Sequence, residues 1–327
     1  MKASPLLFLF GFLITQPSAY AAKEMCPTSR LLAEWMGVTP NQIKWDKDLR
    51  AQCNIQNQWY LGICWDESGL QRLDQVLHQS GDLAPTELLS NDYYAAMRIE
   101  GQIVHDFKLK RPKISEEFDE GYSVTLFHDF FLRAGVVRQD QYRFPTFNGK
   151  SIRTSEKLHK MFYEQLNIAR KNQDTKHLQK TLVKYLGDLS KAPAKAPSAH
   201  FIKAIKESTY AGKQILDLGL DKIESQIIGA LDSGAPVSFG IQNFGNRVDV
   251  AYKTSHIYSG VPNPLKDNTG GHAMNIIGYH LGKNGKVDWY LIENSWGKRF
   301  GTEGTATISA KYLYQQTMEY AIPAVKR

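Results

Sequence analysis

The stretch Gln58-Trp59-Tyr60-Leu61-Gly62-Ile63-Cys64-Trp65 decides the fold class, because it places a cysteine directly before a predicted helix. Leu70, Leu73 and Leu77 then recur at helical spacing, and Ser80-Gly81-Asp82 ends the pattern. A thiol at a helix N-terminus has its thiolate favoured by the helix dipole and by free backbone N–H groups. Taken alone, this stretch also fits a buried structural cysteine.

Two later segments supply the residue types that a cysteine nucleophile needs. Residues 270–274, Gly-Gly-His-Ala-Met, place His272 just before an apolar run, and residues 293–297, Glu-Asn-Ser-Trp-Gly, place Asn294 at the end of a predicted strand. A catalytic thiol requires a base, a group that orients this base, and hydrogen-bond donors for the oxyanion. The three segments together therefore favour nucleophilic chemistry over a purely structural cysteine.

In spacing and order, these segments resemble the papain-like cysteine peptidases. The first fills the family's Gln-x-x-x-Gly-x-Cys-Trp motif, the second its His-Ala segment ending in Gly278-Tyr279, and the third its Asn-Ser-Trp-Gly segment. Weaker similarities extend the match to residues 45–310, interrupted by insertions. The resemblance implies an α+β fold of two subdomains, with a helical left half, a β-barrel-like right half and an active-site cleft between them.

The resemblance also assigns roles residue by residue. Cys64 would be the nucleophile, His272 its base and Asn294 the group that holds the imidazole. Gln58 would donate to the oxyanion, and Trp296 would shield the bond between Asn294 and His272. The function implied is a cysteine endopeptidase that acts on peptide or protein substrates.

Some residues depart from the family pattern and keep two alternatives open. Asp66 and Glu67 follow Trp65 where small or apolar residues are usual, and carboxylates near a thiolate raise its pKa. Glu120-Gly121 stands in place of the family's substrate-binding Gly-Gly pair. Of these two positions, only Gly121 keeps the family's glycine and is expected to contact substrate. The alternatives are a papain-fold binding protein with weak or no catalysis, and a thiol acyl or amide transferase.

Residues 1–21 have the pattern of a secretory signal peptide. Lys2 precedes an apolar run over 6–14, and Ala19-Tyr20-Ala21 supplies a small-x-small cleavage site. The alternative is a retained membrane anchor. No other long apolar run exists, so we expect no transmembrane segment once the leader is removed. We therefore predict a secreted or periplasmic protein, and a bacterial source.

The predicted export also bears on the state of the other two cysteines. An oxidising compartment favours disulfides, and the resemblance reserves Cys64 for catalysis, so we predict a bond between Cys26 and Cys53. Two unpaired thiols are the alternative. Cys26 would lie in an N-terminal segment, residues 22–45, ahead of a peptidase domain over 46–320.

Residues 150–206 form a block that the family does not need. The block carries 13 Lys or Arg and 4 Asp or Glu, so its net charge of +9 exceeds the +7 of the whole chain. Apolar residues at helical spacing mark two helices, at Leu158, Phe162, Leu166 and Ala169, and at Leu178, Leu182, Tyr185, Leu186 and Leu189. We expect an inserted basic helical region that covers the cleft, or docks an acidic partner or an envelope surface. A structural appendage is the alternative.

Composition excludes several other classes. With 327 residues, 42% hydrophobic and 22% charged, the chain is neither disordered nor collagen-like nor a coiled coil. The remaining histidines lack metal-ligand spacing, no glycine-rich phosphate loop is present, and no nucleic-acid-binding motif occurs. We therefore expect no cofactor, no metal and no nucleic-acid partner.

Overall fold

The computed structural model describes residues 43–52, 55, 64–110, 114, 127–200, 202–203, 209–211, 220–241, 272–298, 303–310, 313–314 and 317–322. The helices within these ranges are α3 (Cys64–Ser80), α4 (Asn91–Lys108), α5 (Phe127–Ala134), α6 (Glu156–Lys171), α7 (Thr175–Leu186) and α9 (Leu220–Asp232), with 3-10 turns η2 (Arg50–Gln52) and η3 (Leu189–Lys191). The strands are β1 (Lys47–Asp48), β2 (Thr209–Ala211), β3 (Val237–Ile241), β4 (His272–Leu281), β5 (Val287–Glu293), β6 (Thr305–Ser309) and β7 (Thr317–Ile322).

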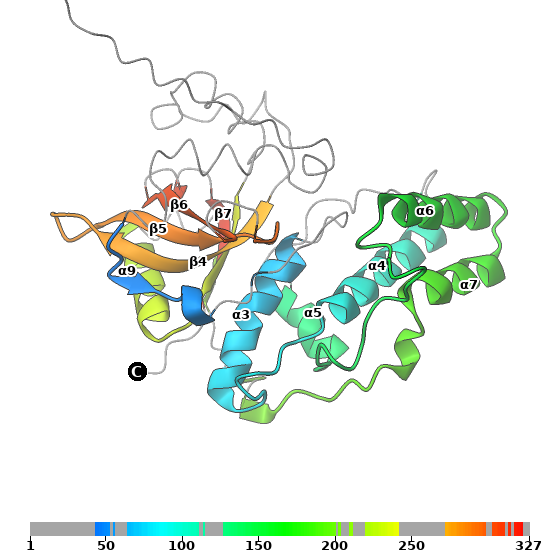
Figure 1. Ribbon diagram of the computed structural model, residues 1–327, viewed down its shortest axis with the longest axis horizontal. Coiled ribbons are helices and arrows are strands. Elements are labelled where there is room, and N and C mark those ends of the chain that lie inside the picture. The colour runs from blue at the N-terminus through cyan, green and yellow to red at the C-terminus, as the bar shows by residue number, and fades with distance from the viewer. Residues whose placement is uncertain are drawn as a thin grey trace, which may run out of the picture.

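The strands form one antiparallel sheet in the order β2-β7-β3-β4-β5-β6, and β1 pairs with β4. Helix α3 crosses beside this sheet and contacts β3 and β4, while the other helices of the first half lie beyond α3 (Figure 1). The predicted α+β class is confirmed, with α3 to α7 gathered on one side and the sheet, with α9 packed on it, on the other.

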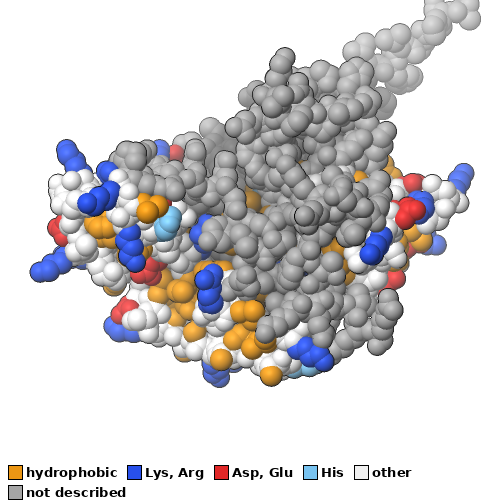
Figure 2. Space-filling model, turned by 180° about the vertical axis from the view of Figure 1, so that it is seen from behind, with side chains coloured by type: hydrophobic (Ala, Val, Ile, Leu, Met, Phe, Trp, Pro, Cys, Tyr) orange, Lys and Arg blue, Asp and Glu red, His pale blue; other side chains and the backbone are white. Residues whose placement is uncertain are grey.

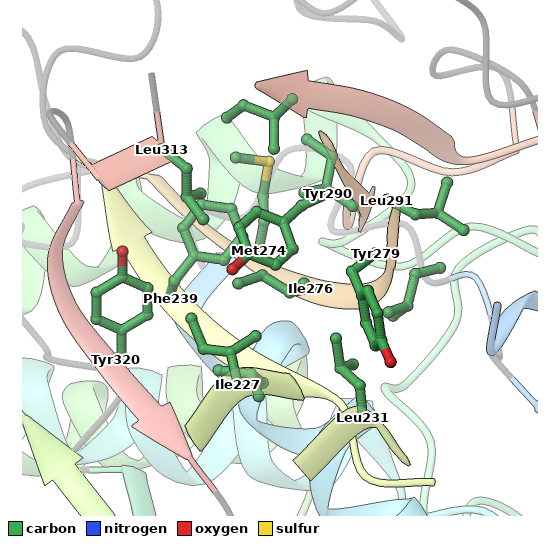
Figure 3. Close-up of a cluster of buried hydrophobic side chains, with 14 of the residues drawn as sticks. Ile227, Leu231, Phe239, Met274, Ile276, Tyr279, Tyr290, Leu291, Leu313 and Tyr320 are labelled. Carbon is green, nitrogen blue, oxygen red and sulfur yellow. The ribbon is translucent and has the colours of Figure 1, made fainter. Parts of the chain in front are cut away.

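The sheet and α9 share one apolar core. Ile227 and Leu231 of α9 point toward Phe239, Met274 and other side chains of the sheet (Figure 3). Burial of this many aliphatic and aromatic side chains is the main stabilising term for this half of the molecule. The core therefore fixes the positions of β4, which begins with the candidate residue His272, and of β5, which leads into the candidate residue Asn294.

Apolar residues alternate along β3, a pattern typical of a strand with one exposed face, yet β3 is buried along its whole length. Val237, Phe239 and Ile241 join the core with α9, as expected of one strand face. Ser238 lies on the other face, and its hydroxyl is 3.3 Å from the carbonyl oxygen of Ser68 in α3. Both faces are covered because α3 packs on the side of β3 opposite α9.

Helix α4 was not expected from the sequence. Its buried stripe includes Ala95, Ala96, Ile99 and Ile103, and Ser90 caps its first turn by accepting from the backbone N–H of Tyr93. Small alanines and polar-tipped tyrosines obscure the helical pattern of large aliphatic residues that identified the other helices. Helix α4 joins α3 to α7, because it lies between them and contacts both (Figure 1).

The predicted helices of the basic block are present as α6 and α7. Phe162 and Leu166 of α6 pack with Leu182 of α7 and with α4 in one apolar cluster. Leu189 lies beyond the helix it was assigned to, because Gly187 ends α7 at a φ of 89° and a 3-10 turn follows. In Figure 1, α6 and α7 lie on the side of α4 away from the sheet. None of the helices in the described part of the chain combines the length and apolar character needed to cross a membrane.

Candidate active site

Cys64 is the first residue of α3, as the sequence predicts. Its side chain is half-buried. The helix dipole and the free N–H groups of the first turn favour the thiolate at this position. Cys64 packs against the apolar cluster that also contains Ala273, the neighbour of His272. Helix α3 contacts β4, where the Ser68 hydroxyl donates to Asn275 Oδ1 over 3.0 Å.

His272 and Asn294 come together at the ends of two paired strands. His272 begins β4 and Asn294 follows β5, and the antiparallel register that opposes Asn275 to Glu293 brings these ends side by side. His272 Nε2 donates to Asn294 Oδ1 over 2.8 Å. An amide oxygen can only accept, so this bond places a proton on Nε2 and leaves Nδ1 of neutral His272 available to accept a proton.

Trp296 lies against this pair. Its ring stacks on the His272 imidazole with centroids 4.5 Å apart and planes at 29°. A flat aromatic surface of this size excludes water from the imidazole and from the bond to Asn294. The contact agrees with the shielding role that the sequence resemblance implies for this tryptophan.

Burial governs the proton affinity of His272. Removal of the imidazole from water lowers its pKa to about 4, and the hydrogen bond to Asn294 opposes this shift. Burial alone therefore holds His272 neutral at pH 7, as required of a general base. A thiolate at Cys64 would favour the imidazolium, so in this site the two charges would stabilise each other.

Buried polar side chains join α3 to the strands of the site. Gln71 Nε2 donates to Glu293 Oε1 over 3.1 Å, and Asn275 Nδ2 donates to Gln71 Oε1 over 2.8 Å. Asn275 Oδ1 in turn accepts from the hydroxyls of Ser68 and Ser238, at 3.0 and 2.7 Å. Because Glu293 precedes Asn294, the chain of bonds fixes α3, which begins at Cys64, relative to β5, which leads into Asn294.

These linking residues belong to no motif that the sequence displays. The only local signal is that Ser68 and Gln71 are polar residues three apart, on a helix whose neighbouring positions are leucines. Their partners lie more than 160 residues further along the chain. The pairing therefore becomes visible only when the sheet and α3 are assembled.

Glu67, expected to disturb the thiolate, is buried and paired. Arg153 Nη2 donates to Glu67 Oε1 over 2.7 Å, and Asn91 Nδ2 donates to Oε2 over 2.6 Å. Burial raises the pKa of Glu67 to about 6, with Arg153 lowering it and Asp92 raising it further. The carboxylate three residues after Cys64 is thus paired with a residue from the basic block.

Other predicted residues lie outside the described part of the chain. These are Gln58, Gly121, Cys26 and Cys53, together with the leader. Within the described ranges, His, Cys, Asp and Glu side chains form no group of three or more that could hold a metal ion. The described site is therefore built from a thiol, an imidazole, an amide and an indole.

Comparison with known proteins gives a family and a fold. The family model described as papain family cysteine protease matches residues 39–323. The cathepsin B-like CP3 of Giardia intestinalis is 32% identical over 95 residues, which are 29% of each protein. The uncharacterized peptidase C1-like protein L477 of Acanthamoeba polyphaga mimivirus is 30% identical over 98 residues, 30% of each protein. The matches thus span less than a third of these relatives.

A solved structure supports the fold independently of close sequence similarity. The crystal structure of PepW from Lactobacillus rhamnosis covers 88% of this chain and 82% of its own, with a TM-score of 0.57 at 15% identity. At this identity the likeness concerns the fold alone. It agrees with the arrangement of α3 beside an antiparallel sheet.

Proposed function

The chain belongs to the papain family of cysteine proteases, and from this premise we propose that it is an endopeptidase acting through Cys64, His272 and Asn294. One observation carries the assignment of residues. The imidazole of His272 is buried, bonded to Asn294 and covered by Trp296, on a strand that packs beside the helix beginning at Cys64. Gln58, in the family motif, is proposed as the oxyanion donor.

The reaction follows from this geometry. Neutral His272 first takes the proton of the Cys64 thiol, and the resulting thiolate attacks the carbonyl carbon of a peptide bond. The C–N bond then breaks to leave a thioester, while protonated His272 gives its proton to the departing amine. His272, again neutral, then takes a proton from water, which attacks the thioester and releases the acid and the free thiol. Asn294 holds the ring through both steps without exchanging protons.

The alternative of a catalytically weak binding protein relied partly on carboxylates beside the nucleophile. Glu67 is paired with Arg153 and Asn91, so it presents no uncompensated charge to Cys64. No described contact favours transfer to an acceptor other than water. We therefore propose hydrolysis as the activity and leave binding or transfer as outcomes that an assay would reveal.

Location and partners complete the proposal. The leader pattern over residues 1–21 supports secretion or a periplasmic site, where Cys26 and Cys53 would pair. The excess charge of the 150–206 block supports an acidic partner or an envelope surface. In the view of Figure 2, however, Lys and Arg side chains are spread among other residues rather than gathered on one basic face.

An internally quenched peptide with both ends chemically blocked tests the proposal. An endopeptidase cleaves such a substrate, whereas an enzyme that needs a free terminus does not. We expect Cys64→Ala to abolish cleavage and Ser80→Ala, at the other end of the same helix, to retain it. Cleavage by the Cys64→Ala protein at the wild-type rate would reject the assignment of the nucleophile.

A further inference from the structure

Arg153 joins the starts of three helices. Glu67 lies in the first turn of α3, one turn after Cys64, and Asp92 lies in the first turn of α4. Arg153 itself stands two residues before Ser155, which caps α6. Its Nη2 donates to Glu67 Oε1 over 2.7 Å and its Nη1 donates to Asp92 Oδ1 over 2.8 Å. A single guanidinium thus links the nucleophile's helix to α4 and to the basic block.

The link is sheltered and well satisfied. Glu67 is 0% exposed and the Arg153 side chain 11% exposed. Asn91 Nδ2 donates to the second oxygen of Glu67 over 2.6 Å, and the Phe144 N–H donates to the second oxygen of Asp92 over 3.1 Å. Charge-assisted bonds in such surroundings have restricted geometry, and loss of one partner leaves a buried charge without compensation.

The apolar core already attaches the block to α4 without this link. Phe162 of α6 and Leu182 of α7 pack with Ile99 and Ile103 of α4 in one cluster. Buried ion pairs add little net stability compared with such packing, but they fix the relative orientation of the groups that they join. What Arg153 adds beyond the apolar core is therefore a fixed connection to Glu67, in the same turn as Cys64.

We propose that Arg153 is a positioning residue for the nucleophile: by holding Glu67 and Asp92 together it sets the first turn of α3, and hence the Cys64 sulfur, relative to His272. The proposal rests on the proposed function, in which Cys64 attacks and His272 serves as its base. Arg153 does not touch the reacting atoms. It acts through the backbone of α3, and displacing a reacting group by about 1 Å costs on the order of 100-fold in rate.

Three variants of the full-length chain test the proposal. Arg153→Met removes the charge and keeps a long apolar side chain. Arg153→Lys keeps the charge but lacks the planar fork that serves two carboxylates at once. The matched control is Arg138→Met, which breaks an ion pair to Glu87 in the same half of the molecule, at a side chain that is 39% exposed.

Turnover per active site separates positioning from folding. Active sites are counted on one portion of each protein by titration with an epoxysuccinyl inhibitor of cysteine peptidases, and hydrolysis of the blocked peptide is measured on another portion. We expect Arg153→Met to lower kcat about 10- to 100-fold with KM changed less than about threefold. Arg153→Lys should recover part of this loss, and Arg138→Met should stay within about twofold of wild type. A residue that serves only stability would change the number of titrated sites and not kcat per site.

A second measurement does not require peptide hydrolysis. The rate of Cys64 labelling by iodoacetamide is followed from pH 5 to pH 9 by mass spectrometry of the peptide that contains it. We expect the midpoint in Arg153→Met to rise toward about 8.5, the value of an unactivated cysteine. If wild type cleaves no peptide, the proposed function fails and this profile still decides the role of Arg153.

Unchanged kcat per site and an unchanged labelling midpoint in folded Arg153→Met would overturn the proposal. If this variant does not fold, Arg153→Lys decides instead, and wild-type values for both quantities would show that bridging two carboxylates is unnecessary. A loss equal in Arg138→Met and Arg153→Met would also overturn it, because the effect would then belong to any ion pair of this half.

Discussion

Replacing Gln71 by leucine tests how strongly the buried polar chain joins α3 to the sheet. Gln71 is buried and makes two hydrogen bonds across this boundary, to Asn275 and to the carboxylate of Glu293. Loss of a partner for a buried polar group costs about 1–3 kcal/mol, and more where the group is charged. Burial of leucine carbon returns about 1 kcal/mol. We expect the free energy of unfolding to fall by about 3 kcal/mol.

Urea denaturation followed by circular dichroism measures this change. The matched control is Gln79→Leu, the same substitution on the same helix, where the exposed amide donates to the carbonyl oxygen of Ser233 over 3.3 Å. We expect this control to differ from wild type by less than about 0.5 kcal/mol, as surface changes usually do. Equal losses in the two variants would refute the reasoning, because burial of the polar chain would then contribute nothing.

Two further predictions concern pH and packing. Since the pKa of Glu67 is about 6 in the folded protein and 4.5 ordinarily, its folded form holds its proton longer, and stability decreases as pH rises through this window. Relative to Glu67→Gln, wild type should lose about 1.5 kcal/mol between pH 4.5 and pH 6.5 in urea titrations, and a constant difference would contradict this. Gly278→Ala would push a methyl group into the carbonyl oxygen of Lys47, where β1 meets β4. Thermal unfolding should show a loss of about 1–3 kcal/mol, and an unchanged midpoint would show that β1 can shift freely.

Local patterns predicted much of the fold from the sequence alone. The helix begun by Cys64 ends at its predicted position, and a glycine in the left-handed region, Gly81, follows it. Such ends depend on a few neighbouring residues, so the sequence displays them directly. The candidate residues Cys64, His272 and Asn294 were likewise found from short motifs whose spacing is fixed.

The sequence did not reveal what depends on distant partners. Helix α4 was missed because alanines and tyrosines form its buried stripe. The connection from Arg153 to Glu67 spans 86 residues, and no pattern near either residue indicates the other. Glu67 was expected to burden the thiolate because an isolated carboxylate would do so. Its compensation appears only when the block at residue 150 and beyond is folded onto α4.

Strand β7 has a consequence for the timing of activity during synthesis. It lies between β2 and β3 in the sheet, and the carbonyl oxygen of Ala321 accepts from Arg72 Nη1 of α3 over 3.3 Å. On the ribosome, the helix with the thiol emerges long before residues 317–322, and pairings between such distant segments form late. A nascent chain therefore carries its nucleophile without the finished sheet beneath it. Order of translation alone delays assembly of the finished sheet beside α3 until most of the residues described here have been made.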